Sequence, residues 1–201
     1  MAHKPLTLLA RQSFITDALE ASSKTKHEMV EACTGDIMKA VDLILRALTE
    51  GKKILLCGNG GSAADAQHIA AEFVVRMSHD INRPALPAIA LTTDTSILTA
   101  GSNDLGFENV FARQVEALGR EGDILVGITT SGNSPNILRA FEIGNKRGLV
   151  TIGLLGAGGS RAASACQLAV IVPSHDTQRI QEGHITIGHI LCALVEQEMY
   201  G

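Results

Sequence analysis

The sequence contains no tryptophan and few other aromatic residues, with one tyrosine and five phenylalanines among 201 residues. So few rings leave little for stacking the bases of a nucleic acid or for an aromatic belt at a membrane surface. Basic residues are not in excess either, because 17 Lys and Arg stand against 21 Asp and Glu, for a net charge of −4. We therefore expect neither a nucleic acid nor a membrane as a partner.

Long apolar runs are also missing. No stretch of roughly 18 apolar residues occurs, and Arg11 and Gln12 interrupt the N-terminal apolar stretch too early for a signal peptide. The sequence has four cysteines, which stand far apart: Cys33, Cys57, Cys166 and Cys192. Without a C-x-x-C pair they predict free thiols rather than a disulfide framework or a zinc finger. We expect a cytoplasmic protein.

The pattern that is present is the alternation of an α/β fold. Five short apolar runs, each followed by a polar or glycine-rich turn, occur at residues 53–57, 88–91, 123–128, 150–155 and 168–172. Helical spacing precedes them over residues 6–50, up to Gly51, and follows them over residues 176–199. These elements predict an α/β fold with an open, doubly wound, five-stranded parallel sheet flanked by helices. Ligands of such folds bind beyond the carboxyl ends of the strands.

The first such turn, GNGGS at residues 58–62, joins a strand to a helix, where backbone N–H groups and the helix dipole favour an anion. Gly58, Gly60 and Ala63 also satisfy the dinucleotide fingerprint G-x-G-x-x-A. That fingerprint requires an acidic residue at the end of the second strand, whereas Asp94 comes slightly late. We therefore expect no nucleotide cofactor.

A second turn, TTSGNS at residues 129–134, places four hydroxyls before a helix that is predicted to begin near Pro135. The alternative interpretation is that serine and threonine merely cap this helix. Capping requires one hydroxyl, whereas the oxygens of a phosphomonoester require many donors. Four hydroxyls therefore favour a phosphate site.

Several polar side chains are spaced so that they could bind a metal ion or a substrate together. His68 and Glu72 are four residues apart on one helix face and can share a metal or a substrate. From spacing alone, an ordinary exposed hydrogen bond between them is the more common arrangement. On the last helix Gln181 shares a face with His189, whereas His184 points about 140° away from His189. This apolar helix could also simply hold one buried histidine whose hydrogen bonds are satisfied. Spacing by itself supports a metal site only weakly.

Three segments together resemble one family. CGNGGSAADAQH at 57–68, TTSGNS at 129–134 and RIQEGH at 179–184 strongly resemble the phosphoheptose isomerases of the sugar-isomerase (SIS) domain superfamily. The resemblance runs from about residue 34 to the C-terminus. It implies an SIS domain over residues 34–201, one compact unit, preceded by an N-terminal helical segment over residues 1–33.

The resemblance implies an aldose–ketose isomerase. Such an enzyme converts D-sedoheptulose 7-phosphate to D-glycero-D-manno-heptose 7-phosphate through an enediol, the first step of ADP- or GDP-heptose biosynthesis. The family feeds lipopolysaccharide core, capsule or other heptose products. The resemblance also implies a homotetramer with active sites at subunit interfaces and one zinc ion, or another divalent metal, per subunit.

The resemblance further assigns roles to residues. It implies that Glu72 is the general base and that His189 is the general acid. The implied metal ligands are His68, Glu72, Gln181 and His189. The implied substrate-binding residues are Asn59, Gly60, Gly61, Glu72, Asn103, Asp104, Thr129, Thr130, Ser131, Ser134 and Gln181. Two positions depart from the family pattern: Thr129 replaces a common serine, and Gly101-Ser102 replaces an apolar residue and glycine before Asn103 in the expected substrate loop.

Proteins with two other functions share features of this sequence. A non-catalytic SIS protein that binds a replication initiator resembles this chain in the glycine turn but lacks the carboxylate four residues after the histidine. Glu72 is present here and favours the enzyme. A sugar-phosphate sensor usually carries a DNA-binding module, and no basic helix-turn-helix segment is visible in residues 1–50.

Overall fold

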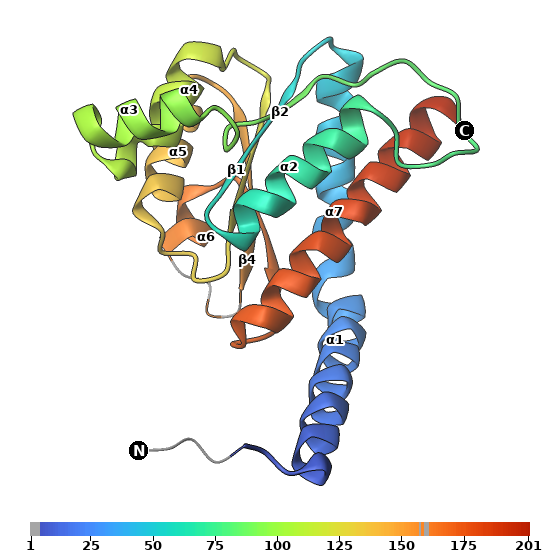
Figure 1. The fold of residues 1–201 in the computed structure, drawn as a ribbon. Coiled ribbons are helices and arrows are strands. Elements are labelled where there is room, and N and C mark those ends of the chain that lie inside the picture. The colour runs from blue at the N-terminus through green and yellow to red at the C-terminus, as the bar shows by residue number, and fades with distance from the viewer. Residues whose placement is uncertain (1–4, 157, 159–160) are drawn as a thin grey trace.

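The computed structural model describes residues 5–156, 158 and 161–201 (Figure 1). Its helices are α1 (Leu8–Thr49), α2 (Gly61–Val74), α3 (Thr95–Leu105), α4 (Val110–Leu118), α5 (Pro135–Lys146), α6 (Arg161–Ala165) and α7 (Thr177–Tyr200), with a 3-10 turn η1 (Phe107–Asn109). Its strands are β1 (Ile54–Gly58), β2 (Ala88–Ala90), β3 (Ile124–Thr129), β4 (Val150–Gly156) and β5 (Leu168–Val172). The predicted strands and the predicted closing helix are confirmed within a residue or two at each end.

The five strands form one parallel sheet in the order β2-β1-β3-β4-β5, which confirms the predicted fold class. The chain moves outward in one direction from β1 to β2 and in the other direction from β3 to β5. The strand order therefore reverses between β1 and β3, the place where open α/β sheets bind ligands. Gly58 at the end of β1 pairs with Ile128 of β3, so the turns that follow these two strands lie side by side.

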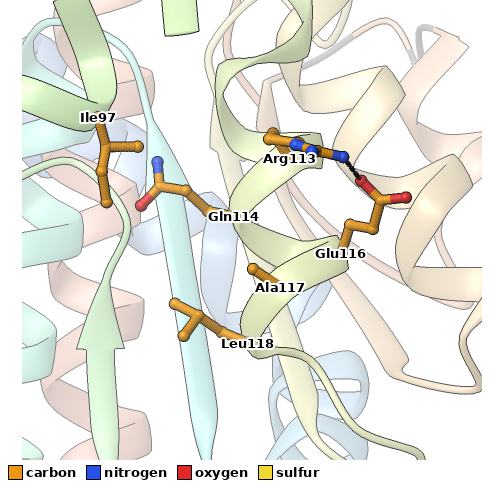
Figure 2. A pocket seen from close by; sticks show the side chains of 6 residues that line it. All are labelled: Ile97, Arg113, Gln114, Glu116, Ala117 and Leu118. Carbon is orange, nitrogen blue, oxygen red and sulfur yellow. Dashed lines mark hydrogen bonds and ion pairs between the residues drawn. The ribbon is translucent and has the colours of Figure 1, made fainter. Parts of the chain in front are cut away.

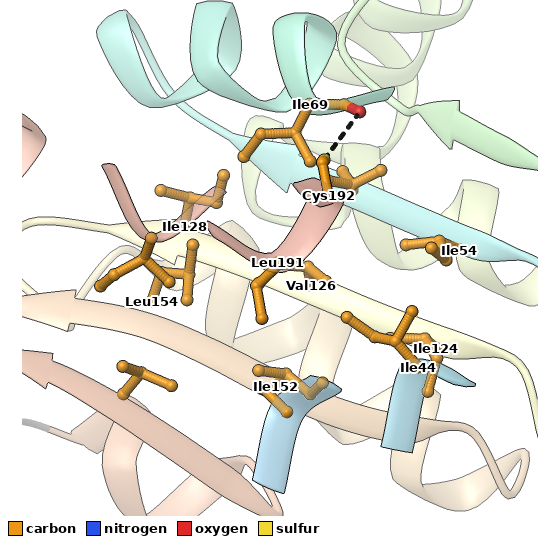
Figure 3. Packing of buried hydrophobic residues seen from close by; sticks show 14 of the residues in the cluster. Ile44, Ile54, Ile69, Ile124, Val126, Ile128, Ile152, Leu154, Leu191 and Cys192 are labelled. Carbon is orange, nitrogen blue, oxygen red and sulfur yellow. Dashed lines mark hydrogen bonds between the residues drawn. The ribbon is translucent and has the colours of Figure 1, made fainter. Parts of the chain in front are cut away.

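Helices cover both faces of the sheet. Ile54 and Leu56 of β1 face a core shared with α1, α2 and α7, which Figure 3 shows in close-up. The alternate residues Leu55 and Cys57 face a second core shared with α4, α5 and α6. All five residues of β1 are buried, as expected for a central parallel strand. The sheet thus separates α2 and α7 from the helices on its other face.

Helix α1 has two unlike halves. Its C-terminal half packs into the first core, and its N-terminal half extends beyond the sheet (Figure 1). Gly51, with φ of +72°, follows the helix as predicted. The helix runs without a break through residues 33 and 34, so the division of the chain at residue 33 stays a prediction. None of the helices described here is long and apolar enough to cross a membrane.

The edge of the sheet away from the two turns is held by an ion pair. Asp123, which is 2% exposed, binds the Lys53 ammonium and accepts backbone hydrogen bonds from Lys53 N at 3.0 Å and Arg120 N at 2.8 Å. Burial alone would raise the pKa of Asp123, but these hydrogen bonds and the charge of Lys53 bring it below its ordinary value. The ionised carboxylate therefore stabilises the starts of β1 and β3.

We expect Asp123→Asn to lower the free energy of unfolding by about 2 kcal/mol at neutral pH, because Lys53 loses its charged partner. The folded-state pKa of Asp123 lies below the unfolded value of about 4, so its stabilisation is complete above that pH and is lost as the pH falls through the folded-state pKa. Urea unfolding of both proteins should therefore show a constant difference near neutral pH that shrinks below about pH 4. An undiminished difference at about pH 3 would contradict this assignment.

Candidate functional site

The glycine turn brings α7 to the start of α2. Strand β1 ends at Gly58, Gly60 has a φ of +56°, and α2 begins at Gly61. A Cβ on Gly61 would lie 1.7 Å from Nε2 of Gln181, so the side chain of Gln181 occupies the space that any larger residue would fill. The absent side chain at Gly61 therefore lets Gln181 reach the positive end of the α2 dipole.

Asn59, predicted to bind substrate, is held by a residue that no motif marked. Its side-chain amide exchanges two hydrogen bonds with the amide of Asn136 in α5, at 2.9 Å and 2.8 Å. Each amide still has a second N–H and a second acceptor lone pair for a ligand. Asn136 is buried and fixes the glycine turn relative to the hydroxyl turn.

The hydroxyl turn is organised around Thr129. This side chain is buried, and its Oγ1 accepts from Gly132 N at 3.2 Å and lies 3.1 Å from Oγ of Ser134. Oγ of Ser131 is 3.5 Å away, so three of the four hydroxyls face one another. Ser134 is the N-cap residue of α5, which begins at Pro135 as predicted, but its hydroxyl makes no capping hydrogen bond. The hydroxyl of Ser134 therefore faces its neighbours in the turn instead of capping the helix.

Three of the predicted site residues meet between α2 and α7. Nε2 of His68 lies 3.3 Å from Oε1 of Glu72 and 2.9 Å from Nε2 of His189. The two imidazole rings are edge to face, with centroids 5.1 Å apart. One potential ligand atom from each residue lies within 4.8 Å of the others. Glu72 and His189 are half-buried, whereas His68 is more open to solvent.

The close approach of the two helices depends on a second glycine. A Cβ on Gly188 of α7 would lie 2.5 Å from Cδ1 of Ile69 in α2. Gly188 immediately precedes His189, and Ile69 immediately follows His68. The missing side chain therefore lets the backbones come near enough for the imidazoles to touch. The only sequence signal was that Gly188 is one of two glycines inside this helical pattern.

The helices α2 and α7 also carry two buried titratable side chains, Asp65 and His184. His184 is fully buried, and burial lowers its pKa to about 4, against a smaller opposing effect of the Leu155 carbonyl. Within the described part of the chain, neither of its ring nitrogens has a hydrogen-bond partner. Burial also raises the pKa of Asp65 to about 6, although His68 opposes the shift. The helix pattern allowed for one buried histidine with satisfied hydrogen bonds; His184 is buried, but it lacks such partners among the described residues.

Asn103 and Asp104 are not brought to this cluster within the chain. They were expected in a substrate loop, but they lie in the last turn of α3, because Asp94 caps a helix that runs to Leu105. Both are exposed, and Nδ2 of Asn103 donates to Oδ1 of Asp104 at 2.7 Å. Helix α3 packs on η1 and α4, on the opposite face of the sheet from α2 and α7 (Figure 1).

A pocket of about 420 Å³ lies between α3 and α4, away from the predicted site residues (Figure 2). Its charged groups, Arg113 and Glu116, pair with each other. The amide of Gln114 donates to the carbonyls of Leu91 and Val110. With its polar groups engaged in this way, the pocket offers little for recognising a polar ligand.

His68, Glu72 and His189 form a cluster that could hold a metal ion. Imidazole nitrogens and carboxylate oxygens are common zinc ligands, and two ligands on one tetrahedral zinc ion lie about 3.3 Å apart. The two separations that involve His68, 3.3 Å and 2.9 Å, are close to that value, and all three ligand atoms lie within 4.8 Å of one another. Gln181, the fourth predicted ligand, lies on the same helix as His189 and packs on Gly61.

Comparison with known proteins places the chain in a family. The SIS domain family matches residues 19–156. The phosphoheptose isomerase of Clostridium acetobutylicum is 50% identical over 192 residues, covering 94% of this chain and 97% of the relative. That of Burkholderia pseudomallei is 49% identical over 191 residues, covering 94% and 96%.

Two solved structures are similar along nearly the whole chain. The phosphoheptose isomerase of Neisseria gonorrhoeae superposes with a TM-score of 0.87 and 43% identity, covering 92% of this chain and 98% of that one. The phosphoheptose isomerase of Francisella tularensis gives 0.89 and 38% identity, covering 96% and 100%. This chain therefore belongs to the SIS domain family and, within it, to the phosphoheptose isomerases.

Proposed function

We propose that this protein isomerises D-sedoheptulose 7-phosphate to D-glycero-D-manno-heptose 7-phosphate. The observation that carries the proposal is the meeting of Glu72 and His189, a carboxylate and an imidazole from two different helices, on the helix α2 that begins at the glycine turn and on α7 beside it. The carboxylate of Glu72 reaches back to His68, with Oε1 3.3 Å from Nε2, and His68 is about 10 Å from Gly61 along α2, which is comparable with the length of an extended seven-carbon sugar phosphate. One substrate can therefore reach both ends of the site.

In the proposed mechanism Glu72 takes the proton from C1 of the ketose, while His189 donates a proton to the carbonyl oxygen on C2. The product of this step is an enediol. The Glu72 carboxyl, whose proton exchanges with solvent while the enediol is bound, then delivers a proton to C2, and His189 accepts the proton of the hydroxyl on C1, which leaves the aldose. The two residues end in their starting protonation states, so the reaction requires no external acid or base.

We infer that the phosphate lies between the turns at residues 58–62 and 129–134. The first turn offers the start of α2, and the second offers Thr129, Thr130, Ser131 and Ser134 before α5. Helix N-termini and clustered hydroxyls both suit a phosphomonoester. Gln181, which packs on Gly61, is placed to contact the sugar between the phosphate and Glu72.

We infer that the active sites lie between subunits of a homotetramer. Asn103 and Asp104 lie on the far face of their own chain, so they contact substrate from a neighbouring copy. The N-terminal half of α1 supports the assembly, because it exposes five large apolar side chains: Leu8, Leu9, Phe14, Ile15 and Leu19.

Sedimentation of the full chain should give four times its mass of 21.2 kDa, and a monomer would contradict the assembly.

We propose that His68, Glu72, Gln181 and His189 hold one zinc ion per subunit. When bound, such an ion polarises the carbonyl of the sugar and stabilises negative charge that develops on its oxygen. His68 lies beside both Glu72 and His189, so in this proposal its role is to hold the cation, while the other two also exchange protons.

The proposed reaction places the protein at the start of ADP- or GDP-heptose biosynthesis in the cytoplasm, which supplies lipopolysaccharide or capsule. A non-catalytic SIS protein is the less favoured function. The carboxylate of Glu72 lies against the two imidazoles, and the relatives with about half of their residues identical are named as isomerases.

We expect Glu72→Gln to lower kcat by at least about 100-fold and to leave substrate binding within a few-fold, because the amide cannot accept the C1 proton. Conversion of sedoheptulose 7-phosphate and calorimetric binding would measure the two effects. Glu116→Gln removes a carboxylate of the same kind on α4 and should leave both unchanged. Normal turnover by Glu72→Gln would contradict the proposed base.

Chelation followed by zinc repletion should first lower and then restore activity, with about one zinc per chain by elemental analysis. His68→Ala should reduce the bound zinc, because it removes the imidazole that contacts two of the other three proposed ligands, Glu72 and His189. Fully active enzyme without bound metal would contradict the proposed role of zinc.

A further inference from the structure

A buried ion pair joins Arg83 to Glu196, outside the residues assigned to the site so far. Arg83 lies between α2 and β2, Glu196 lies in α7, and each side chain is 1% exposed. Arg83 Nε and Glu196 Oε1 are 2.6 Å apart. Burial alone would raise the pKa of Glu196, but hydrogen bonds from Arg83 and Ser78 N bring it below its ordinary value. The carboxylate is therefore ionised.

The guanidinium of Arg83 also binds the end of α2. Nη2 donates to the backbone carbonyl of Glu72 at 2.8 Å, and Nη1 donates to that of Phe73 at 2.8 Å. Both carbonyls belong to the last turn of α2, where helices leave carbonyls without a partner. The planar fork of an arginine holds such acceptors in fixed directions, whereas a lysine provides only a point charge. Arg83 thereby fixes the backbone of the residue that carries the Glu72 carboxylate.

Glu196 connects the same guanidinium to the face of α7 that carries His189. It follows His189 by seven residues, close to two helical turns, so the two side chains differ in direction by about 20°. The carboxylate also accepts from Ser78 N at 2.7 Å and from Met77 N at 3.3 Å. The pair therefore ties the chain that leaves α2 to the helix that carries the second proposed catalytic group.

Cys192 shows how close these charges are to one another. Its thiol lies between the helices, with Sγ 4.0 Å from the carbonyl oxygen of Ile69. Burial raises its pKa, the carboxylates of Glu72 and Glu196 raise it further, and Arg83 opposes them. The pKa of this one buried thiol is therefore affected both by the ion pair and by the carboxylate of Glu72.

Stability alone is a weak reason for burying such a pair, because well-packed apolar replacements are often as stable. We propose that Arg83 and Glu196 are positioning residues that hold Glu72 against His189. This inference rests on the isomerase function proposed above. The pair binds the last turn of α2, whereas the proposed phosphate site lies at the first turn. Its loss should therefore lower kcat and leave KM nearly unchanged.

The test compares two double variants. Arg83→Met with Glu196→Gln removes this pair, and Lys53→Met with Asp123→Asn removes the buried pair at the starts of β1 and β3. The control is matched, because Asp123 also binds one cation and accepts two backbone N–H groups. Each protein is assayed for kcat and KM with sedoheptulose 7-phosphate and for urea unfolding. The single variant Arg83→Lys keeps the positive charge but loses the planar guanidinium with its several donors. It is tested as well, so that a result is obtained even if the first double variant does not fold.

We expect kcat to fall about 10- to 100-fold for the Arg83 variants, a size that matches a displacement of about 1 Å between reacting groups. KM should stay within about threefold, and the Lys53 and Asp123 double variant should keep the wild-type kcat. A folded Arg83 variant with normal kcat, or an equal loss in the control, would overturn the proposal.

A readout that needs no activity separates this proposal from the proposed function. His68 and His189 are 2.9 Å apart at Nε2, so their imidazole nitrogen resonances report the geometry between α2 and α7. These resonances should shift in Arg83→Lys and not in the control. If the wild type fails to isomerise the sugar, the proposed function is wrong, and these shifts still decide whether the pair positions the two helices. Unchanged resonances would overturn the positioning role.

Discussion

The contact between α2 and α7 is the constraint on which the site depends. Gly188 and Ile69 pack so closely that a Cβ on the glycine would lie 2.5 Å from the isoleucine side chain. Because these residues are next to His189 and His68 in sequence, their packing sets the distance between the two imidazoles. A carboxylate and two imidazoles from separate helices form a common site only while this contact holds.

The sheet supplies the other half of the arrangement. The strand order reverses between β1 and β3, so the glycine turn and the hydroxyl turn emerge next to each other. The reciprocal amide pair of Asn59 and Asn136 then fixes one turn to the other. Gln181 joins the two parts, because it extends from the helix of His189 to the glycine turn. The anion-type turns and the polar cluster are thus held by one framework.

The sequence predicted most of what is local and little of what is long-range. Apolar runs and glycines located the strands and turns, and the four-residue spacing put His68 and Glu72 on one helix face. The meeting of these two with His189, 121 residues beyond His68, followed from a family resemblance and not from spacing. Asn136, Gly188 and Arg83 have no motif, because their partners become neighbours only when the chain folds. The last turn of α3 at Asn103 was missed because serine, glycine and asparagine resemble a loop.

The most direct test of the account is the fate of the hydrogen on C1 when the protein acts on sedoheptulose 7-phosphate in deuterated water. Proton transfer through Glu72 predicts an aldose product that carries solvent deuterium at C2, detectable by mass analysis and by the loss of the C2 proton signal. No conversion, or a product whose C2 hydrogen comes entirely from C1 without deuterium, would contradict the account.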